Sequence, residues 1–511
     1  MFYKIISGSL FGIDSEIVVV EVDLAQGLPC FQVVGLPDAS VRESKERIRS
    51  AIVNSGLKFP AKRITVNLSP ANIRKEGTHF DLPIAVGIAA SLGYINSNNG
   101  HTIENYAFLG ELSLDGKVNK IKGALPIAIG LRSNGIKNLI APMENIEELE
   151  IVEDINLIPV NSLNHVLDFI NSKVEINYQR KERNTLSNRN SYEDFSEVYG
   201  QESVKRAIQI AASAAHNILM IGPPGSGKSM IAKRIPSILP SLSFDEILEV
   251  TKIYSIAGEL SKEMPIVNER QFRSPHHTIT KIGLFGGGNN PKPGEVTLAH
   301  NGVLYFDELP EFSRMTLELL RQPMEDEKIL ISRANNTATF PSKFMFVASM
   351  NPCPCGYYGS NKINCICKEF QIRNYLSKCS GPLLDRIDMH IDVLPIDFKD
   401  INNCKDNKSS LEMKTEVEEA RMIQIERYKG ENISYNSQLT QKLMNKYCIL
   451  DSKTKVLMES AFTKLNLSAR GYNKIIKISR TIADLDRKEK INFGHVAEAI
   501  SYRSIDKKYF R

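Results

Sequence analysis

The chain has 511 residues and a formal net charge of +5, so it is too long for a single core and predicts about three domains. A net charge this small does not by itself indicate a nucleic-acid partner. The opening stretch MFYKIISGSLFGIDSEI carries acidic residues where a signal peptide would be apolar, and the longest nearly uncharged stretch, residues 82–95, is shorter than a membrane span of about 20 apolar residues. We therefore expect a soluble cytoplasmic protein without a membrane segment.

Two polar, charged segments with few aliphatic residues mark candidate boundaries in the chain. They cover residues 177–197 and 397–410. Read as linkers, they separate an N-terminal domain over residues 1–176 from a central domain over 198–396 and a C-terminal domain over 411–511.

The first motif in chain order is GELSLDGKVNKIKGALPIAIGLRSNGIKNLIAPMEN, residues 110–145, which resembles the proteolytic domain of Lon proteases. That resemblance implies a Ser–Lys dyad, but His79 stands at the serine's place in KEGTHFDLP and Leu125 stands at the lysine's place in KGAL. Activated attack of this kind needs both a hydroxyl nucleophile and an amine base. We therefore expect a non-proteolytic Lon-like domain, with Thr78 as an alternative nucleophile.

The segment ILMIGPPGSGKSMIAKRI reads as an apolar strand, a glycine-rich turn and a helix. Its G-x-x-x-x-G-K-S spacing predicts a P-loop that wraps the phosphates of ATP with backbone N–H groups. Lys228 would reach the β- and γ-phosphates, and Ser229 would hold Mg²⁺. The predicted nucleotide-binding residues of this loop are Gly222, Pro223, Pro224, Gly225, Ser226, Gly227, Lys228 and Ser229.

A second apolar run, Val303 to Phe306 in GVLYFDELPEF, ends in the acidic pair Asp307 and Glu308. A continuous apolar run of this length is typical of a buried parallel strand. Beside a P-loop, Asp307 would complete the Mg²⁺ site and Glu308 would polarise the attacking water. The alternative is an acidic pair that merely solvates a strand end.

Two further segments carry candidate catalytic residues. KFMFVASMN reads as a strand that ends in Asn351, which would orient the water against the γ-phosphate. GPLLDRIDMHIDV carries Arg386, which would act as an arginine finger on the ATP of an adjacent subunit. The alternative for Arg386 is a surface ion pair with Asp385 or Asp388.

Five segments together carry a more specific resemblance than the P-loop alone. They are FRSPHHTIT (272–280), PGEVTLAHNGVLYFDELPEF (293–312), NPCPCG (351–356), GPLLDRID (381–388) and LSARGYNKIIKISRTIADL (467–485). Over nearly the whole chain, these segments resemble the Mg-chelatase-like AAA+ ATPases of the YifB/ComM type. The resemblance implies an α/β fold in which an AAA+ P-loop ATPase core with a helical lid follows the α+β Lon-like domain.

The same resemblance assigns roles to residues outside the P-loop. It implies that Arg386 is the arginine finger and that Arg470 is the sensor-2 arginine, which contacts the γ-phosphate from the lid. It also implies a β-hairpin over residues 327–344, around Asn335 and Asn336, that faces the pore of a ring.

Four of the protein's eight cysteines lie within fifteen residues, as two C-x-C pairs at Cys353, Cys355, Cys365 and Cys367. Thiols stay reduced in the cytoplasm, which disfavours disulfides. Four thiolates could surround a tetrahedral Zn²⁺, although the usual spacing is C-x₂₋₄-C. Structural zinc, free thiols in a loop and a redox switch remain open alternatives.

The resemblance implies a ring-forming motor, expected to be a hexamer, that uses ATP and Mg²⁺ to act on DNA. Branch migration or helicase activity during recombination of incoming DNA, as in natural transformation, is the expected function. Residues 466–511 hold eleven Lys and Arg against five Asp and Glu, which is compatible with DNA or with a solvated helical face. Two alternatives are a chelatase-type motor that remodels a protein partner and an ATP-dependent protease.

Overall fold

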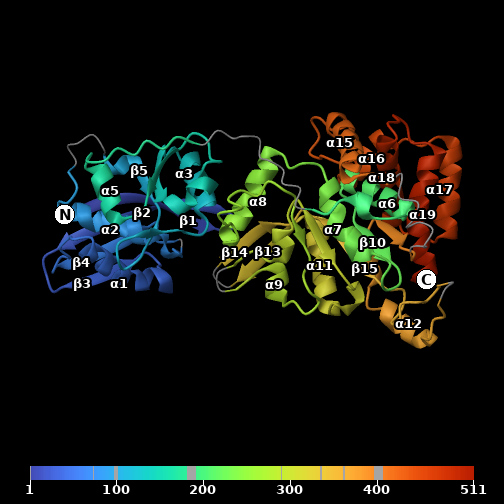
Figure 1. Ribbon diagram of the computed structural model, residues 1–511, viewed down its shortest axis with the longest axis horizontal. Helices are drawn as coiled ribbons and strands as arrows, with labels where there is room; N and C mark the ends of the chain where they lie inside the picture. The colour runs from blue at the N-terminus through green and yellow to red at the C-terminus, as the bar shows by residue number, and fades with distance from the viewer. Residues whose placement is uncertain are drawn as a thin grey trace.

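The computed structural model describes residues 2–72, 74–96, 102–180, 192–288, 291–333, 336–360, 363–395 and 407–510. In Figure 1, one sheet with its helices lies at the N-terminal end of an elongated molecule, a second sheet lies in the middle, and a group of helices lies at the far end. Helices and parallel strands dominate this arrangement, which confirms the predicted α/β class.

The N-terminal region is built on a mixed seven-stranded sheet of order β3-β4-β2-β1-β5-β8-β9. β1 and β2 form an antiparallel hairpin, whereas β5, β8 and β9 all run parallel to β1. The strands are β1 (Phe2–Phe11), β2 (Asp14–Ala25), β3 (Cys30–Val34), β4 (Arg63–Ser69), β5 (Tyr106–Phe108), β8 (Asn138–Pro142) and β9 (Asn156–Val160).

Helices cover both faces of this sheet because successive side chains of a strand point to opposite sides. Ile5 of β1 belongs to the core that also contains α1, α2 and α5, whereas Ile6 packs against the core that contains α3 and α4. The helices are α1 (Ala39–Asn54), α2 (Asp81–Ser91), α3 (Ala124–Ser133), α4 (Ile146–Leu149) and α5 (Leu163–Ile170).

The middle region is built on a five-stranded sheet of order β11-β12-β15-β10-β16, in which every neighbouring pair is parallel. All the residues of β10 and β12 are buried, as their continuous apolar sequences predict. The strands are β10 (Ile218–Ile221), β11 (Phe272–Arg273), β12 (Val303–Phe306), β15 (Met345–Met350) and β16 (Met389–Asp392).

Two separate apolar cores lie on the faces of this sheet. Met220 and Tyr305 face the core that contains α6 and α7, whereas Leu219 and Phe306 face the core that contains α9 to α13. The helices of the region are α6 (Glu202–Ala214), α7 (Lys228–Ile238), α8 (Phe244–Ala257), α9 (Lys281–Phe285), α10 (Glu295–Leu298), α11 (Arg314–Asp326), α12 (Glu369–Leu376) and α13 (Gly381–Leu384).

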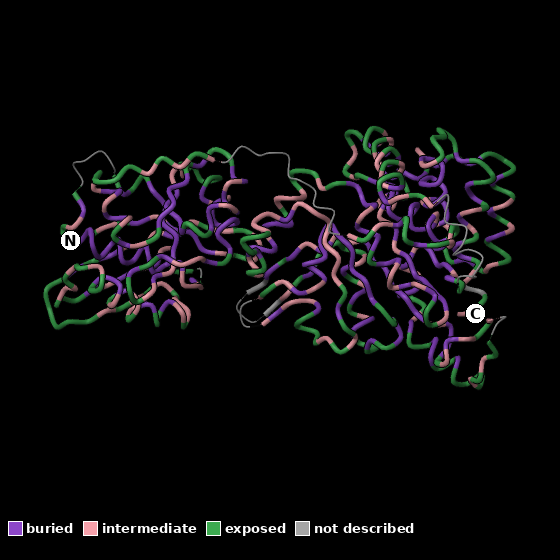
Figure 2. The backbone as a smooth tube through the Cα atoms, viewed as in Figure 1, coloured by how far each residue is buried: buried purple, intermediate pink, exposed green. Residues whose placement is uncertain are grey.

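The C-terminal helices share the first of these cores with the sheet. Met413 of α15 and Ile478 of α18 belong to the same buried cluster as Met220, and the purple interior in Figure 2 runs from the sheet into these helices. α19 also packs on β16 at the sheet's edge. The helices are α15 (Ser410–Arg427), α16 (Gln441–Tyr447), α17 (Ser452–Lys464), α18 (Ala469–Leu485) and α19 (Phe493–Tyr509).

The N-terminal region contacts the middle region mainly through α3 and α8. Ser255 on α8 donates a hydrogen bond of 2.8 Å to the buried carboxylate of Glu148, and its carbonyl accepts from the backbone N–H of Gly123 at 3.0 Å. The ammonium of Lys120 donates to the carbonyl of Leu260 at 3.0 Å. These polar contacts, together with apolar packing of Leu248 on the N-terminal core, connect the two regions.

Three predicted segments fall partly outside the described residues. The hairpin consists of β13 (Lys328–Arg333) and β14 (Asn336–Pro341), paired antiparallel, and Asn335 lies outside the described residues. Most of each predicted linker also lies outside them, namely residues 181–191 of the first and residues 397–406 of the second.

Candidate active site

The G-x-x-x-x-G-K-S segment forms the turn between β10 and α7. Gly227 is the residue before α7 and adopts φ of +88°, a left-handed conformation that side chains with a Cβ rarely take. The helix therefore begins at Lys228, with its first N–H groups at the mouth of the turn. Such an N-terminus favours an anion.

Lys228 lies buried over this turn. Its ammonium donates to the carbonyls of Gly222 at 2.7 Å and Pro223 at 2.8 Å, and to the side-chain oxygen of Asn351 at 3.2 Å. Desolvation by burial lowers the pKa of Lys228 to about 8, although Asp307 and Glu308 favour its charged form. A cation held on neutral oxygens in this way can transfer to phosphate oxygens at little cost.

Asp307 stands at the carboxyl end of β12 among three hydroxyl groups. Its carboxylate accepts hydrogen bonds from Ser229 at 2.9 Å, from Tyr305 at 2.9 Å and from Ser349. Burial opposes ionisation of Asp307, but these hydroxyls outweigh burial and hold its pKa below the ordinary value. The hydroxyl of Ser229 and this carboxylate are the hard oxygen donors that Mg²⁺ prefers, so the residues present fit the ion.

Glu308 follows Asp307 and is exposed at the same edge of the sheet. Its backbone adopts φ of +51°, and its N–H donates to Asp307 at 3.1 Å and to Ser349 at 3.3 Å. These bonds hold a non-glycine residue in a sparsely populated conformation, which is a feature that clusters at functional sites.

The structure brings these predicted residues together at the carboxyl ends of the strands, which form the carboxyl edge of the sheet. The P-loop follows β10, Asp307 and Glu308 follow β12, and Asn351 follows β15. Because the three strands are parallel neighbours, their carboxyl ends meet.

Arg386 and Arg470 lie at the amino ends of the strands, which form the amino edge of the sheet. Arg386 precedes β16, and its carbonyl accepts from the amide of Asn217, which precedes β10. The guanidinium of Arg386 lies 2.8 Å from one carboxylate oxygen of Glu325, and that of Arg470 lies 3.3 Å from the other. Both arginines line a cavity of about 550 Å³ at the amino ends of the strands, away from the P-loop of the same chain.

A buried ion pair fixes α18 to the segment that carries Arg386. Asp388 accepts from the backbone N–H of Asn217 at 2.9 Å, and the ammonium of Lys474 lies 2.9 Å from it. Burial opposes ionisation of Asp388, but Lys474 and His216 outweigh it and hold the pKa of Asp388 far below its ordinary value. Lys474 stands one helical turn after Arg470, so this pair sets the position of the helix face that carries Arg470.

Comparison with known proteins gives matches along nearly the whole chain. Residues 194–401 match the family described as magnesium chelatase, subunit ChlI, residues 20–145 match subunit ChlI of Mg-chelatase, and residues 407–503 match the ChlI C-terminal family. The competence protein ComM of Haemophilus influenzae is 38% identical over 506 residues, 98% of this chain and 97% of the relative. The uncharacterized protein YifB of Escherichia coli is 38% identical over 497 residues, 97% and 96% of the two chains.

This chain belongs to the YifB/ComM family of Mg-chelatase-like AAA+ ATPases. The family resemblance predicted from the five sequence segments is thereby confirmed. A more distant relative is the magnesium-chelatase 38 kDa subunit of Cereibacter sphaeroides, 23% identical over 174 residues, 31% of this chain and 52% of the relative. Membership of the AAA+ family implies ATP and Mg²⁺ as cofactors, and the donor groups around Lys228 and Asp307 fit both.

The N-terminal residues singled out by the Lon resemblance have structural partners in this YifB/ComM chain. His79 is buried, and its Nε2 lies 2.9 Å from the carbonyl of Gly8. Leu125 is fully buried in the core beneath α3. The hydroxyl of Thr78 donates to the carboxylate of Glu111, so its proton points to an acid rather than an amine base. The Lon-like character of the region stays a prediction.

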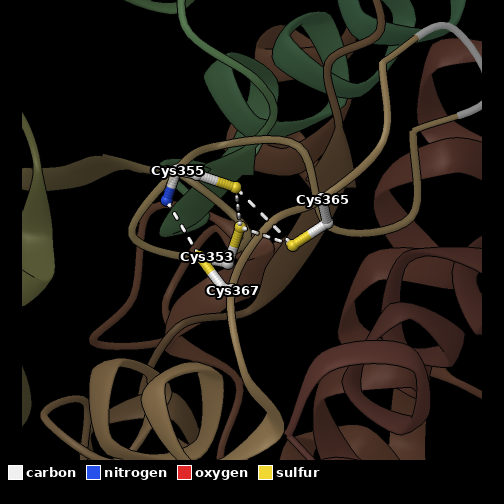
Figure 3. Close-up of side chains that lie close together, drawn as sticks. All are labelled: Cys353, Cys355, Cys365 and Cys367. Carbon is white, nitrogen blue, oxygen red and sulfur yellow. Dashed lines mark hydrogen bonds between the residues drawn. The ribbon is translucent and has the colours of Figure 1, made fainter.

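The four clustered cysteines lie in the loop between β15 and α12. Figure 3 shows their side chains converging, and their sulfur atoms all lie within 4.8 Å of one another. Cys353 is buried and belongs to the core that contains α9 to α13.

Among the described helices, none is both long and apolar enough to cross a membrane.

Sequence reasoning missed three residues of the two edges. Tyr305 on β12 and Ser349 on β15 each stand two positions before a predicted residue that directly follows the strand, Asp307 and Asn351. Alternation along a strand places i and i+2 on one face, and this signal could have identified both hydroxyls. No local pattern distinguishes Glu325, the shared partner of the two arginines, from other acidic residues of α11.

Proposed function

We propose that this protein is an ATP-hydrolysing ring motor that acts on DNA, with branch migration or unwinding of incoming DNA as its activity. The observation that carries the ATPase part is the convergence of Lys228, Ser229, Asp307 and Asn351 at one edge of a parallel sheet. Membership of the AAA+ family supports both the hydrolysis and the ring.

At this edge the residues have separate roles. Lys228 would leave its loop carbonyls for the β- and γ-phosphate oxygens, while Ser229 and Asp307 would hold Mg²⁺. When bound, Mg²⁺ neutralises charge on the phosphates. Glu308 would accept a proton from the attacking water, and Asn351 would orient that water.

The opposite edge supplies the argument for an assembly. Arg386 and Arg470 line a cavity at the amino ends of the strands, so neither lies near the P-loop of its own chain. If subunits pack with the amino edge of one against the carboxyl edge of the next, both arginines meet the neighbour's γ-phosphate. A heterologous contact of this kind forms a ring when the rotation between subunits closes, and we propose that it closes as a hexamer. This extends the predicted sensor-2 role of Arg470 to action between subunits.

Support for DNA comes from the relative named competence protein ComM, which aligns with 98% of this chain. The basic C-terminal segment does not add to it, because many of its cations are engaged within the protein. Those with acidic or carbonyl partners are Arg470, Lys474, Lys477, Arg480, Arg487, Arg503 and Lys508.

The hairpin β13–β14, which precedes β15, is the element that we propose to meet DNA in the pore.

A chelatase-type motor that remodels a protein partner is the second candidate. The magnesium-chelatase descriptions of the matching families favour it. The two candidates share the ATP site and differ only in what the ring moves, so ATP hydrolysis cannot distinguish them.

The deciding experiment uses branched DNA. Purified protein is incubated with ATP, Mg²⁺ and a labelled three-stranded or forked DNA, and strand exchange is followed on gels. We expect ATP-dependent migration that a Lys228→Ala variant lacks. Intact ATPase activity with neither binding to nor movement of these DNAs would reject the DNA motor and favour a protein partner. Casein cleavage in the same preparation would instead support a protease.

A further inference from the structure

We infer that Cys353, Cys355, Cys365 and Cys367 hold one structural zinc ion, and that this ion fixes the loop that packs against the P-loop. Nothing in the ATPase chemistry uses these thiols. They are contributed by two C-x-C pairs from the two ends of a single loop between β15 and α12, and their side chains turn toward one point (Figure 3).

The spacing of the sulfur atoms fits a tetrahedral ion. Cys353 Sγ lies 3.4 Å from Cys355 Sγ and 3.7 Å from Cys365 Sγ, and the last two are 3.5 Å apart. Zinc–sulfur bonds of about 2.3 Å at tetrahedral angles separate the sulfur atoms by about 3.8 Å. A disulfide needs about 2.05 Å, so these contacts are not disulfide bonds. The short C-x-C spacing therefore does not prevent four sulfurs from meeting.

Backbone N–H groups donate hydrogen bonds to two of the sulfur atoms. The N–H of Tyr358 donates to Cys353 Sγ at 3.3 Å, and the N–H of Cys355 donates to Cys367 Sγ at 3.3 Å. Such outer contacts orient thiolate ligands and stabilise their charge. Four thiolates without a carboxylate or imidazole among the described cluster residues select a soft tetrahedral ion, zinc or iron. In this chain, we assign zinc because a closed set of four cysteine ligands is typical of structural zinc sites.

The loop between the two pairs contacts the nucleotide site directly. Gly356 adopts φ of +87°, and a Cβ at this position would lie 2.3 Å from Cδ of Pro224 in the P-loop. Cys353 itself stands two residues after Asn351, which binds Lys228. An ion that closes the cysteine cluster would therefore hold the turn of Gly356 against Pro224. This second part of the inference rests on the proposed ATP site, whereas the zinc assignment does not.

Metal content tests the zinc assignment. Protein purified under reducing conditions, without chelators or a metal-affinity step, is analysed by plasma mass spectrometry. We expect about one zinc per chain. A Cys353→Ser/Cys365→Ser variant should lose it, while a Cys30→Ser variant, changed at the exposed cysteine of β3, should keep it. Metal-free wild-type protein whose cluster thiols react freely with a thiol reagent would overturn the assignment, and so would iron.

A second measurement covers the case in which the double variant does not fold. Wild-type protein is titrated with a mercurial, and released zinc is followed with the dye 4-(2-pyridylazo)resorcinol. The zinc should leave in step with modification of the cluster thiols. In folded single Cys355→Ser protein, zinc transfer to the dye should be faster by at least about tenfold, since even outer-shell changes cost 10- to 100-fold. Zinc released before any thiol is modified would overturn the assignment.

The link to the P-loop is tested by a glycine pair. Gly356→Ala should weaken binding of a fluorescent ATP analogue by at least about tenfold, because its methyl group meets Pro224, while zinc stays at about one per chain. Gly359→Ala is the matched control, since Gly359 also has a positive φ of +75° but its nearest neighbour is Lys508 at 3.6 Å. Equal affinities in the two variants would overturn the link and leave the zinc assignment standing.

Discussion

The carboxyl ends and the amino ends of the strands in the five-stranded sheet, called the carboxyl edge and the amino edge, carry different groups. At the carboxyl edge, Lys228 binds neutral oxygens of its own loop, and Asp307 binds hydroxyls. At the amino edge, Arg386 and Arg470 share the single carboxylate of Glu325. The first edge can receive phosphates, and the second carries the charge that a γ-phosphate would need but offers no phosphate-binding turn. We propose that each edge is half of a site, which a second copy of the chain would complete.

The largest expected effect tests that division. Arg386→Ala should lower the ATPase rate at least about 1000-fold, as loss of an arginine finger does. Mixed with inactive Lys228→Ala protein, it should regain partial activity, because some intact P-loops then face intact arginines. Phosphate release is measured before and after mixing. Arg373→Ala, on the exposed face of α12, is the control.

Two outcomes would break the comparison between the edges. If activity does not recover on mixing although mass measurements confirm mixed oligomers, then Arg386 only forms its ion pair with Glu325. Near-normal activity of Arg386→Ala protein would mean that the amino edge takes no part in hydrolysis.

The next effect concerns the carboxyl edge alone. Glu308→Gln should lower turnover about 100-fold or more, since the amide cannot accept a proton from water. Binding of a fluorescent ATP analogue should persist, because the Lys228 and Asp307 contacts do not involve the Glu308 side chain. Glu311→Gln, three residues further along, is the matched control. Turnover near the wild-type rate would assign water activation to another residue.

A third test uses the titration of Lys228, whose pKa burial lowers to about 8. Phosphates favour the ammonium form, so nucleotide binding above that pH must take up a proton. Affinity should be constant from about pH 7 to 8 and then fall by up to about tenfold per pH unit. Equilibrium binding across this range, with proton uptake measured by calorimetry in two buffers, checks it. Constant affinity up to about pH 9.5 would contradict the lowered pKa of Lys228 in the free protein.

The carboxyl edge was predictable from the sequence because its residues lie in contiguous motifs at strand ends. A glycine-rich turn before Lys228 and apolar runs before Asp307 and Asn351 each report a local conformation, and parallel pairing brings strand ends together. The α/β class was predicted from the family resemblance. Locating these residues in the sequence needed no knowledge of side-chain packing.

The amino edge was not predictable in the same way. Arg386 was predicted from its own segment and Arg470 by resemblance, but their shared partner Glu325 lies on α11, 61 residues before Arg386 in the numbering. Nothing local to α11 indicates that contact. The cysteine cluster is intermediate, since the sequence brought four thiols within fifteen residues, but only the fold shows that they converge and that Gly356 meets the P-loop.

The smallest expected effect tests whether Glu325 occupies the place of a phosphate. Glu325→Gln removes a partly exposed anion that competes with the γ-phosphate for Arg386 and Arg470. Exposed ion pairs contribute at most about 1 kcal/mol, so the apparent KM for ATP should fall by no more than about fivefold, with kcat nearly unchanged. Glu318→Gln, which alters another acid on α11 paired with Arg321, should leave KM unchanged. If kcat instead fell about tenfold in Glu325→Gln protein, Glu325 would hold the arginines in their productive position, and the amino edge would be a preorganised site rather than a self-neutralised one.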